Sequence, residues 1–308
     1  MKVIELQKYG GAEALQLVDH PEPVVGSGEV LVGIAATSFN PVDSKRASGL
    51  LKAILPIRFP FVPGGDFSGV VEAIGEGVTG FRKGDAVYGS SAGGGTYAER
   101  VAVDAKSIAI KPTNLSHGEA ASLALVGQTA AQAIEAAGVV KGKTVLIHGA
   151  GGAVGSVAVQ LAHYYGATVI GTASADDAAR LLGYGARQVI DRNTRFEDQI
   201  ESVDVVIDAV GGEVQARSFA VLKEGGILIA LSEPPSQDEA RRHGVTATML
   251  FTQGSTASLD ALRERIEGGD VVPFVGQHYP LAEASHVWLK AAAGGTKGKI
   301  VIDVLEGK

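Results

Sequence analysis

The sequence contains no cysteine, and this absence narrows the chemistry of the chain. Without cysteine there is no disulfide, no thiolate nucleophile and no sulfur ligand for zinc. The seven histidines are scattered and show no spacing typical of metal ligands. We therefore expect a protein without a bound metal.

Positive charge and long apolar runs are also scarce. The chain has 27 Lys and Arg against 34 Asp and Glu, and no basic stripe, which argues against a nucleic-acid partner. The most apolar window, residues 120–140, is interrupted by Gln128, Gln132 and Glu135, as is typical of a core-facing helix rather than a membrane span. The first residues lack the apolar core of a signal peptide. We expect a cytoplasmic protein with no membrane partner.

Apolar residues and glycine are plentiful. Apolar residues make up 45% of the chain, which is enough to bury a core. The 42 glycines allow many tight turns. A length of 308 residues predicts about two domains.

The stretch KTVLIHGAGGAVG, residues 143–155, predicts a strand at 144–148, a glycine turn and the start of a helix that ends at Gly166. Backbone N–H groups and the positive helix end make such a turn an anion site, and a dinucleotide pyrophosphate is its natural occupant. Against the fingerprint G-x-G-x-x-G the aligned residues are Ala150, Gly152 and Gly155, so the first glycine is replaced and an extra one stands at Gly149. Taken alone, the turn also fits a purely structural strand–helix connection.

The residues that follow favour the nucleotide interpretation. Strand-like runs at 168–173, 188–190, 203–208 and 226–231 alternate with helical segments, one of which begins at Asp176. This alternation predicts an α/β fold with a doubly wound parallel sheet, whose ligand crevice lies at the carboxyl ends of the strands.

The N-terminal part has a different pattern. Glycine, proline and aspartate turns separate short strands, and few helical periods occur before Ser116, which predicts an antiparallel, barrel-like domain. A last strand–helix–strand segment is expected to return to this domain. The predicted domains are therefore 1–115 with 272–308, and 116–271. The expected N-terminal strands are 3–6, 15–18, 29–36, 69–74, 86–88 and 96–103.

Six segments in a fixed order resemble the medium-chain dehydrogenase/reductase superfamily, in its zinc-free quinone oxidoreductase and enone reductase branch, to which zeta-crystallin belongs. The likeness runs from Met1 to Val304 and implies a GroES-like β-barrel domain, a Rossmann domain and an active site in the cleft between them. The segments are SFNPVDSKRASG (38–49), FVPGGDFSGVV (61–71), GDAVYG (84–89), GTYAERVAV (95–103), VLIHGAGGAVGSVAVQLA (145–162) and GKIVIDV (298–304).

The resemblance also bears on zinc. Zinc-dependent members place a cysteine, a histidine–glutamate pair and a further acid or cysteine around the catalytic metal, whereas this chain has Pro63-Gly64-Gly65-Asp66 and no cysteine. Without a Lewis acid, simple alcohol oxidation is disfavoured. Quinones and α,β-unsaturated carbonyl compounds, which delocalise the charge left by hydride addition, are the expected acceptors.

The cofactor is predicted from the end of the second parallel strand. NAD sites place an acid there to bind the ribose 2′-hydroxyl, but this chain has Gly171-Thr172-Ala173-Ser174. The pattern Ser174-x-x-Asp177 is typical of a capping box, which would hold the acidic residues in the first helical turn. Ser174, Arg180 and Arg192 are candidates to bind a 2′-phosphate, which predicts NADPH. Each of the three also fits a helix cap or a solvated surface residue.

Further cofactor contacts follow from the resemblance. Asn40 matches an asparagine near the nicotinamide ribose and ring, and Thr129 a threonine at the nicotinamide end; turn chemistry and a buried helix hydroxyl are the alternatives. Asp43 is expected to hold the loop after Asn40. The pyrophosphate turn comprises Gly149, Gly151, Gly152, Ala153 and Val154, and the residues expected to line the crevice, or else to belong to the core, are Val210, Leu231, Ser232 and Phe251.

The expected reaction is hydride transfer from NADPH to a quinone or to the β-carbon of an enone, with the proton supplied by solvent. The protein contributes orientation and water exclusion, and no catalytic residue is required. Tyr88 and Tyr97 are possible proton donors but are more typical of barrel packing. The segment GLLKAILPIRFPF, which ends at Phe61, either lines a hydrophobic substrate cleft or forms a helix packed on the barrel.

Two other functions stay open. The chain also fits an NADPH-binding sensor or structural protein with little turnover, or an enoyl-thioester reductase that uses Lys45, Arg46 and Lys52 as a basic patch. Relatives dimerise through a late edge strand of the Rossmann sheet, so we expect a homodimer through residues 245–251.

Overall fold

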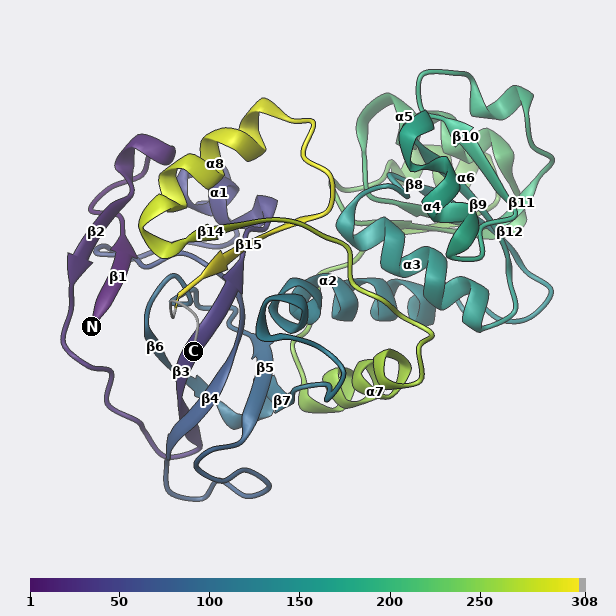
Figure 1. Cartoon of the computed structure of the whole chain (residues 1–308). Coiled ribbons are helices and arrows are strands. Elements are labelled where there is room, and N and C mark those ends of the chain that lie inside the picture. The colour runs from purple at the N-terminus through teal and green to yellow at the C-terminus, as the bar shows by residue number, and fades with distance from the viewer. Residues whose placement is uncertain (305–308) are drawn as a thin grey trace. The chain divides into compact units, whose positions relative to one another are not determined.

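The computed structural model describes residues 1–304, which divide into two compact units (Figure 1). The N-terminal unit comprises Met1–Leu125, Gly254–Glu267 and the segment that begins at Pro273. The parallel-sheet unit comprises Val126–Gln253 and Gly268–Val272. The division falls within helix α2 (His117–Ala136).

The N-terminal unit is built on a seven-stranded, mainly antiparallel sheet in the order β14-β15-β3-β4-β5-β7, with β6 also paired to β3. Val30, Val32 and Ile34 alternate along β3 and are fully buried, because successive side chains of a strand point to opposite faces. A separate hairpin is formed by β1 and β2. The strand bounds are β1 (Lys2–Glu5), β2 (Gln16–Asp19), β3 (Glu29–Ser38), β4 (Asp66–Ile74), β5 (Ala86–Ser90), β6 (Arg100–Asp104) and β7 (Ile108–Ile110).

The last part of the chain adds two strands to this sheet. Strand β14 (Val275–Pro280) leads through helix α8 (Ala284–Ala293) to β15 (Lys299–Asp303), which lies parallel to it. Strand β15 pairs antiparallel with β3, with Val301 opposite Ser38. Trp288 of α8 is buried in the same apolar cluster as Tyr97.

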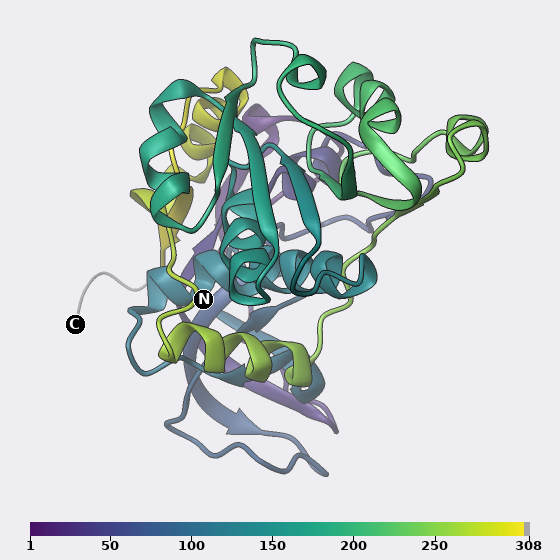
Figure 2. The same ribbon diagram turned by 90° about the vertical axis from the view of Figure 1, so that its right-hand side faces the viewer.

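Two helices of this unit were not expected there. Helix α1 (Pro41–Ala47) begins with a capping box between Asn40 and Asp43 and has proline at its first position, two start signals present in the sequence NPVD. Helix α7 (Thr256–Glu267) lies beside β7 (Figure 1), and Figure 2 shows the same helix in yellow-green from another side. The Leu259 carbonyl accepts a hydrogen bond from the Tyr88 hydroxyl at 2.6 Å. Because this contact joins segments 171 residues apart, local sequence pattern placed α7 with the wrong neighbours.

The other unit contains the predicted doubly wound sheet. Its six strands are all parallel and lie in the order β10-β9-β8-β11-β12-β13, which is the Rossmann order 3-2-1-4-5-6. Val145, Leu146 and Ile147 are consecutive on β8 and all fully buried, so both faces of the sheet are covered. The strands are β8 (Thr144–His148), β9 (Thr168–Ala173), β10 (Gln188–Asp191), β11 (Val203–Asp208), β12 (Leu222–Ala230) and β13 (Thr246–Met249).

Three of these strands, β8, β9 and β11, have the predicted bounds, whereas β12 begins four residues earlier than expected, at Leu222 rather than Gly226. The helix predicted from Asp176 starts as a 3-10 turn, Ala175–Asp177. No helix within residues 1–304 is long and apolar enough to cross a membrane. The helices of this unit, besides the end of α2, are α3 (Ala153–Tyr164), α4 (Ala178–Gly183), α5 (Gly212–Ser218) and α6 (Gln237–Arg242).

Candidate cofactor site and buried polar network

The turn between β8 and α3 has the shape that a dinucleotide site needs. Gly149 adopts a positive φ of 71°, a conformation that glycine reaches without strain. A Cβ at Gly155 would lie 2.2 Å from the Gly149 carbonyl oxygen, so only glycine lets α3 pack directly on the turn. The extra glycine and the last fingerprint glycine therefore both have structural reasons, and the helix N-terminus is directed at the turn as predicted.

Ala150, which replaces the first fingerprint glycine, is accommodated by the neighbouring strand. Its backbone N–H donates to the Thr172 carbonyl at 3.0 Å, which ties the turn to β9. A Cβ at Gly171 would lie 2.8 Å from the Ala150 methyl carbon, closer than such contacts allow. The glycine missing from the turn is thus matched by one on β9, a compensation that the fingerprint pattern did not reveal.

His148, the last residue of β8, is fully buried and held by two hydroxyl groups. The Ser218 hydroxyl donates to the Val214 carbonyl at 2.7 Å, so it accepts from His148 Nε2–H at 3.0 Å, and Nδ1 accepts from Thr172 at 3.0 Å. Burial lowers the pKa of His148 from 6.5 to about 4, although nearby Asp208 opposes the shift. His148 is therefore a neutral structural residue beneath the turn.

The predicted crevice residues meet at the carboxyl edge of the parallel sheet. In the register of the sheet, Asp208 of β11 is opposite His148 on one side and Ala230 on the other, and Ala230 is opposite Met249. Residues that follow these strand ends therefore share one edge: Val210, Leu231, Ser232 and Phe251. Val210 is 48% exposed and Phe251 57% exposed, so both apolar side chains are open to solvent at this edge.

Asp208 fixes the position of Val210. The sequence analysis did not predict this role of Asp208. Its buried carboxylate accepts hydrogen bonds from the backbone N–H groups of Val210 at 2.9 Å and Gly211 at 3.0 Å. The Gln215 side chain donates to the same carboxylate at 3.0 Å. A carboxylate at a strand end followed by Ala-Val-Gly-Gly was the available signal, since it matches the turn-forming role of aspartate.

Thr129 lies in the part of α2 that belongs to this unit. Its hydroxyl is 2.7 Å from that of Thr252, and one turn further the side chain of Gln132 exchanges two hydrogen bonds with the backbone of Gln253. These bonds hold the segment after β13, which carries Phe251, against the helix. Thr129 is thus placed beside the predicted crevice residue Phe251.

The predicted 2′-phosphate residues gather at the end of β9, but a carboxylate joins them. Ser174 Oγ donates to Asp177 Oδ2 at 2.6 Å, and Arg180 Nη2 donates to Asp177 Oδ1 at 2.6 Å and to the Gly151 carbonyl at 3.0 Å. Arg192 is exposed and follows Asp191, which pairs with Ala173 in the register of the sheet.

The predicted capping box at Ser174 is not formed. Ser174 makes no side-chain cap hydrogen bond and instead donates to the Asp177 carboxylate. The reason is the ion pair with Arg180, whose guanidinium attracts that carboxylate toward the glycine turn.

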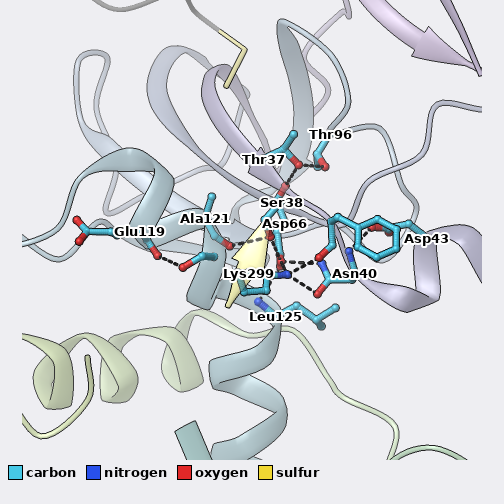
Figure 3. Close-up of polar contacts among 12 residues, drawn as sticks. Thr37, Ser38, Asn40, Asp43, Asp66, Thr96, Glu119, Ala121, Leu125 and Lys299 are labelled. Carbon is cyan, nitrogen blue, oxygen red and sulfur yellow. Dashed lines mark hydrogen bonds and ion pairs between the residues drawn. The ribbon is translucent and has the colours of Figure 1, made fainter. Parts of the chain in front are cut away.

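The N-terminal unit contains a buried polar network centred on Asp66 (Figure 3). Ser38 and Asn40 donate to Asp66 Oδ2 at 2.6 and 2.7 Å, and the Leu125 backbone N–H donates to Oδ1 at 2.8 Å. Lys299 Nζ lies 3.2 Å from Oδ2. Asp66 belongs to the Pro63–Asp66 stretch that replaces the zinc ligands, and here it binds an ammonium group.

Lys299 has a full set of acceptors. Besides Asp66, its ammonium donates to the Phe39 carbonyl and to Asn40 Oδ1, each at 2.7 Å. Burial lowers the pKa of Lys299, and the carboxylates of Asp66 and Asp43 oppose that shift. Asn40 therefore uses its side-chain amide N–H with Asp66 and its oxygen with Lys299, and it also caps α1.

Asp43 and two tyrosines of this unit are buried as well. Asp43 accepts from the Asn40 backbone N–H at 2.8 Å, and burial raises its pKa to about 7. The Tyr97 hydroxyl accepts from Trp288 Nε1 at 3.3 Å, and Tyr88 donates to α7. Burial raises the pKa of both tyrosines, so both hydroxyls are structural groups.

Within residues 1–304, no three His, Asp or Glu side chains are arranged to hold a metal ion. The apolar segment before Phe61 forms turns rather than the alternative of a packed helix, and Leu50 is 72% exposed. Arg46 stacks over the Phe61 ring at 5.1 Å and donates to the Ala92 carbonyl at 2.9 Å. Arg46 is thus half-buried and engaged with protein groups.

The Rossmann strand order, the glycine turn and the crevice edge define a nucleotide-dependent oxidoreductase with a separate antiparallel unit. Two family profiles agree with this class. The profile of the "Alcohol dehydrogenase GroES-like domain" matches residues 26–113, and that of "Zinc-binding dehydrogenase" matches residues 184–302.

Individual proteins identify the branch. The "2-methylene-furan-3-one reductase" of Solanum lycopersicum is 36% identical over 98% of this chain and 79% of its own length. The quinone oxidoreductase from Coxiella burnetii is 34% identical and superposes with a TM-score of 0.91 over 99% of both chains. The Escherichia coli quinone oxidoreductase, solved in complex with NADPH, is 27% identical, with a TM-score of 0.90 over 99% of this chain and 100% of that one. The chain belongs to the medium-chain dehydrogenase/reductase superfamily, in the branch of quinone oxidoreductases and enone reductases, and it is an oxidoreductase.

Proposed function

We propose that this protein is an NADPH-dependent, zinc-independent reductase that transfers hydride to a quinone or to an α,β-unsaturated carbonyl compound. The observation that carries the proposal is the carboxyl edge of the parallel sheet, where the side chain of Val210 lies against the glycine turn at a helix N-terminus and Phe251 follows the end of β13. The names of the relatives support the same substrate classes.

The residues of this edge fit a dinucleotide. The backbone of the turn, Gly149 to Val154, would hold the pyrophosphate, and Ser174, Arg180 and Arg192 lie at the strand end where an adenosine 2′-phosphate is expected. Thr129, Val210, Leu231, Ser232 and Phe251 would line the nicotinamide side. When bound, the cofactor supplies the hydride, and the protein supplies orientation and a site from which water is excluded.

Zinc independence is supported by the surroundings of Asp66. Its carboxylate already receives three side-chain donors and one backbone N–H, and one of those donors is the Lys299 ammonium. A metal ion would have to displace that ammonium, and the sequence offers no cysteine to help bind it. Without a Lewis acid, the favoured acceptors are those that delocalise negative charge themselves.

Protonation of the reduced acceptor is assigned to solvent. The hydroxyls of Tyr88 and Tyr97 are buried, used in structural hydrogen bonds and raised in pKa, so neither is suited to donate a proton near neutral pH. Contact between Asn40 and the nicotinamide stays a prediction, because Asp66 and Lys299 engage its side chain.

The direct test is NADPH oxidation with a small quinone and, separately, with an α,β-unsaturated ketone, each repeated with NADH. Turnover of either acceptor with NADPH supports the proposal, and the faster acceptor identifies the subclass. Tight NADPH binding without turnover of either would instead support a sensor or structural role. The enoyl-thioester alternative is weakened because Arg46, one of its three basic residues, is stacked on Phe61.

We also propose a homodimer. Strand β13 is an edge strand of the parallel sheet, as the predicted dimer strand requires, and its free edge could pair with that of a second copy. A monomeric mass by light scattering at micromolar concentration would contradict this. The cytoplasmic location stays a prediction.

A further inference from the structure

The carboxylate of Asp177 lies against the glycine turn. A Cβ at Gly151 would be 2.6 Å from Asp177 Oδ2, so the carboxylate occupies the space that the absent side chain of Gly151 leaves open. Ala173, the last residue of β9, would contact the same Cβ at 3.4 Å. Asp177 therefore lies between the turn and the end of the second strand.

This location is where a Rossmann unit receives the ribose of the adenosine half. Asp177 satisfies its two oxygens there with Ser174 and Arg180, each at 2.6 Å. These are two of the three residues proposed to bind a 2′-phosphate. A phosphate and the carboxylate seek the same donors, and they repel each other when both are charged.

We propose that Asp177 is a specificity-determining residue, which competes with the 2′-phosphate of NADPH for Ser174 and Arg180 and so limits the preference for NADPH over NADH. This inference rests on the proposed function. NADPH binding requires the carboxylate to leave its two partners and turn away from Gly151. NADH carries a hydroxyl at that position, which a carboxylate can accept as a hydrogen-bond partner, so NADH requires no such displacement.

The chain offers a matched pair of variants for a test. Asp177→Asn removes the charge at nearly constant size, and Asp176→Asn makes the same change one residue earlier, at an exposed position of the same turn. We expect D177N to lower the Kd for NADPH about tenfold and to change the Kd for NADH by no more than about twofold. For D176N we expect changes of about twofold or less with both cofactors. Fluorescence titration of each purified protein measures both constants without an acceptor.

A second measurement isolates the contribution of the 2′-phosphate to binding. Displacement of bound NADPH by 2′,5′-ADP and by 5′-AMP compares fragments that differ only in the 2′-phosphate, and D177N should strengthen binding of only the first. The proposal is overturned if D177N changes both cofactors or both fragments equally, or leaves NADPH binding unchanged. If D177N does not fold, as judged by its thermal midpoint, D177S answers the same question. Quinone or enone turnover by the unmodified protein is measured separately, so the reductase proposal can fail while the binding result stands.

Discussion

The two units stabilise buried charge in different ways. In the N-terminal unit, Asp66 is neutralised by Lys299, which lies 233 residues away in the sequence. In the parallel-sheet unit, the buried carboxylate of Asp208 is satisfied by N–H groups two and three residues further on and by Gln215. The first arrangement depends on long-range closure of a sheet, whereas the second is specified within one strand–turn–helix unit.

The largest expected effect comes from breaking the long-range pair. Lys299→Met leaves the carboxylate of Asp66 buried without its cation, and removal of one partner of a buried pair costs about 3–5 kcal/mol. The free energy of unfolding from a guanidinium titration measures the loss. The double variant K299M/D66N should recover part of it, because the uncompensated charge is then absent. A loss below about 1 kcal/mol for K299M would show that the pair is not an essential part of the sheet.

In the parallel-sheet unit, buried His148 should make the free energy of unfolding depend on pH. The pKa of His148 is lowered from 6.5 to about 4, so the folded state binds fewer protons than the unfolded state between these values. Its contribution to stability is fully present above pH 6.5 and is lost as pH falls through about 4. The expected change in unfolding free energy is up to about 3 kcal/mol, measured by titrations at several pH values. The variant H148Q should lack this dependence.

For Asp43 of the N-terminal unit, the expected dependence of stability on pH has the opposite sign. Its pKa is raised from 3.8 to about 7, so its contribution is present below 3.8 and is lost as pH rises through about 7. D43N should therefore remove a loss of stability that occurs as pH rises toward about 7. H148Q should remove a loss of stability that occurs as pH falls toward about 4. Identical pH profiles for the two variants would contradict both assignments.

The smallest expected effect tests the local packing of the glycine turn. Gly171→Ala would bring two methyl carbons to 2.8 Å and should destabilise the protein by about 1–3 kcal/mol. A150G/G171A moves the methyl group from the turn to β9 and should restore most of the thermal midpoint. Gly183→Ala is a matched control, because a Cβ there meets nothing within 4 Å. Equal destabilisation by G171A and by the double variant would refute the proposed compensation.

Local sequence pattern was sufficient for the parallel-sheet unit. The apolar β-branched runs predicted β8, β9 and β11 to the residue, and the alternation of strands and helices predicted the doubly wound parallel sheet. The strand ends that share this edge could also be named from the sequence, because parallel strands end at one edge whatever their order; contact of these residues with a cofactor stays a prediction. Strands β1 to β6 were found with shifted bounds, β7 was missed, and α1 was missed although its capping signals lie in NPVD.

Contacts between distant segments could not be predicted in the same way. Nothing near Asp66 indicates Lys299, and nothing in residues 256–267 indicates that α7 packs beside β7. The orientation of Asp177 was missed for a related reason. Its sequence spacing favours a helix cap, but the guanidinium of Arg180, fixed by the Gly151 carbonyl, offers the carboxylate a stronger partner.

The sequence by itself determined the two-part α/β architecture, the glycine turn and the edge at which a nucleotide would bind, because each follows from local periodicity and backbone geometry. Only the tertiary structure decided that Lys299 neutralises Asp66, that Gly171 makes room for Ala150 and that Asp177 lies on the turn. The physical reason is that burial makes every charge and methyl group depend on its neighbours in space, and those neighbours come from distant parts of the chain.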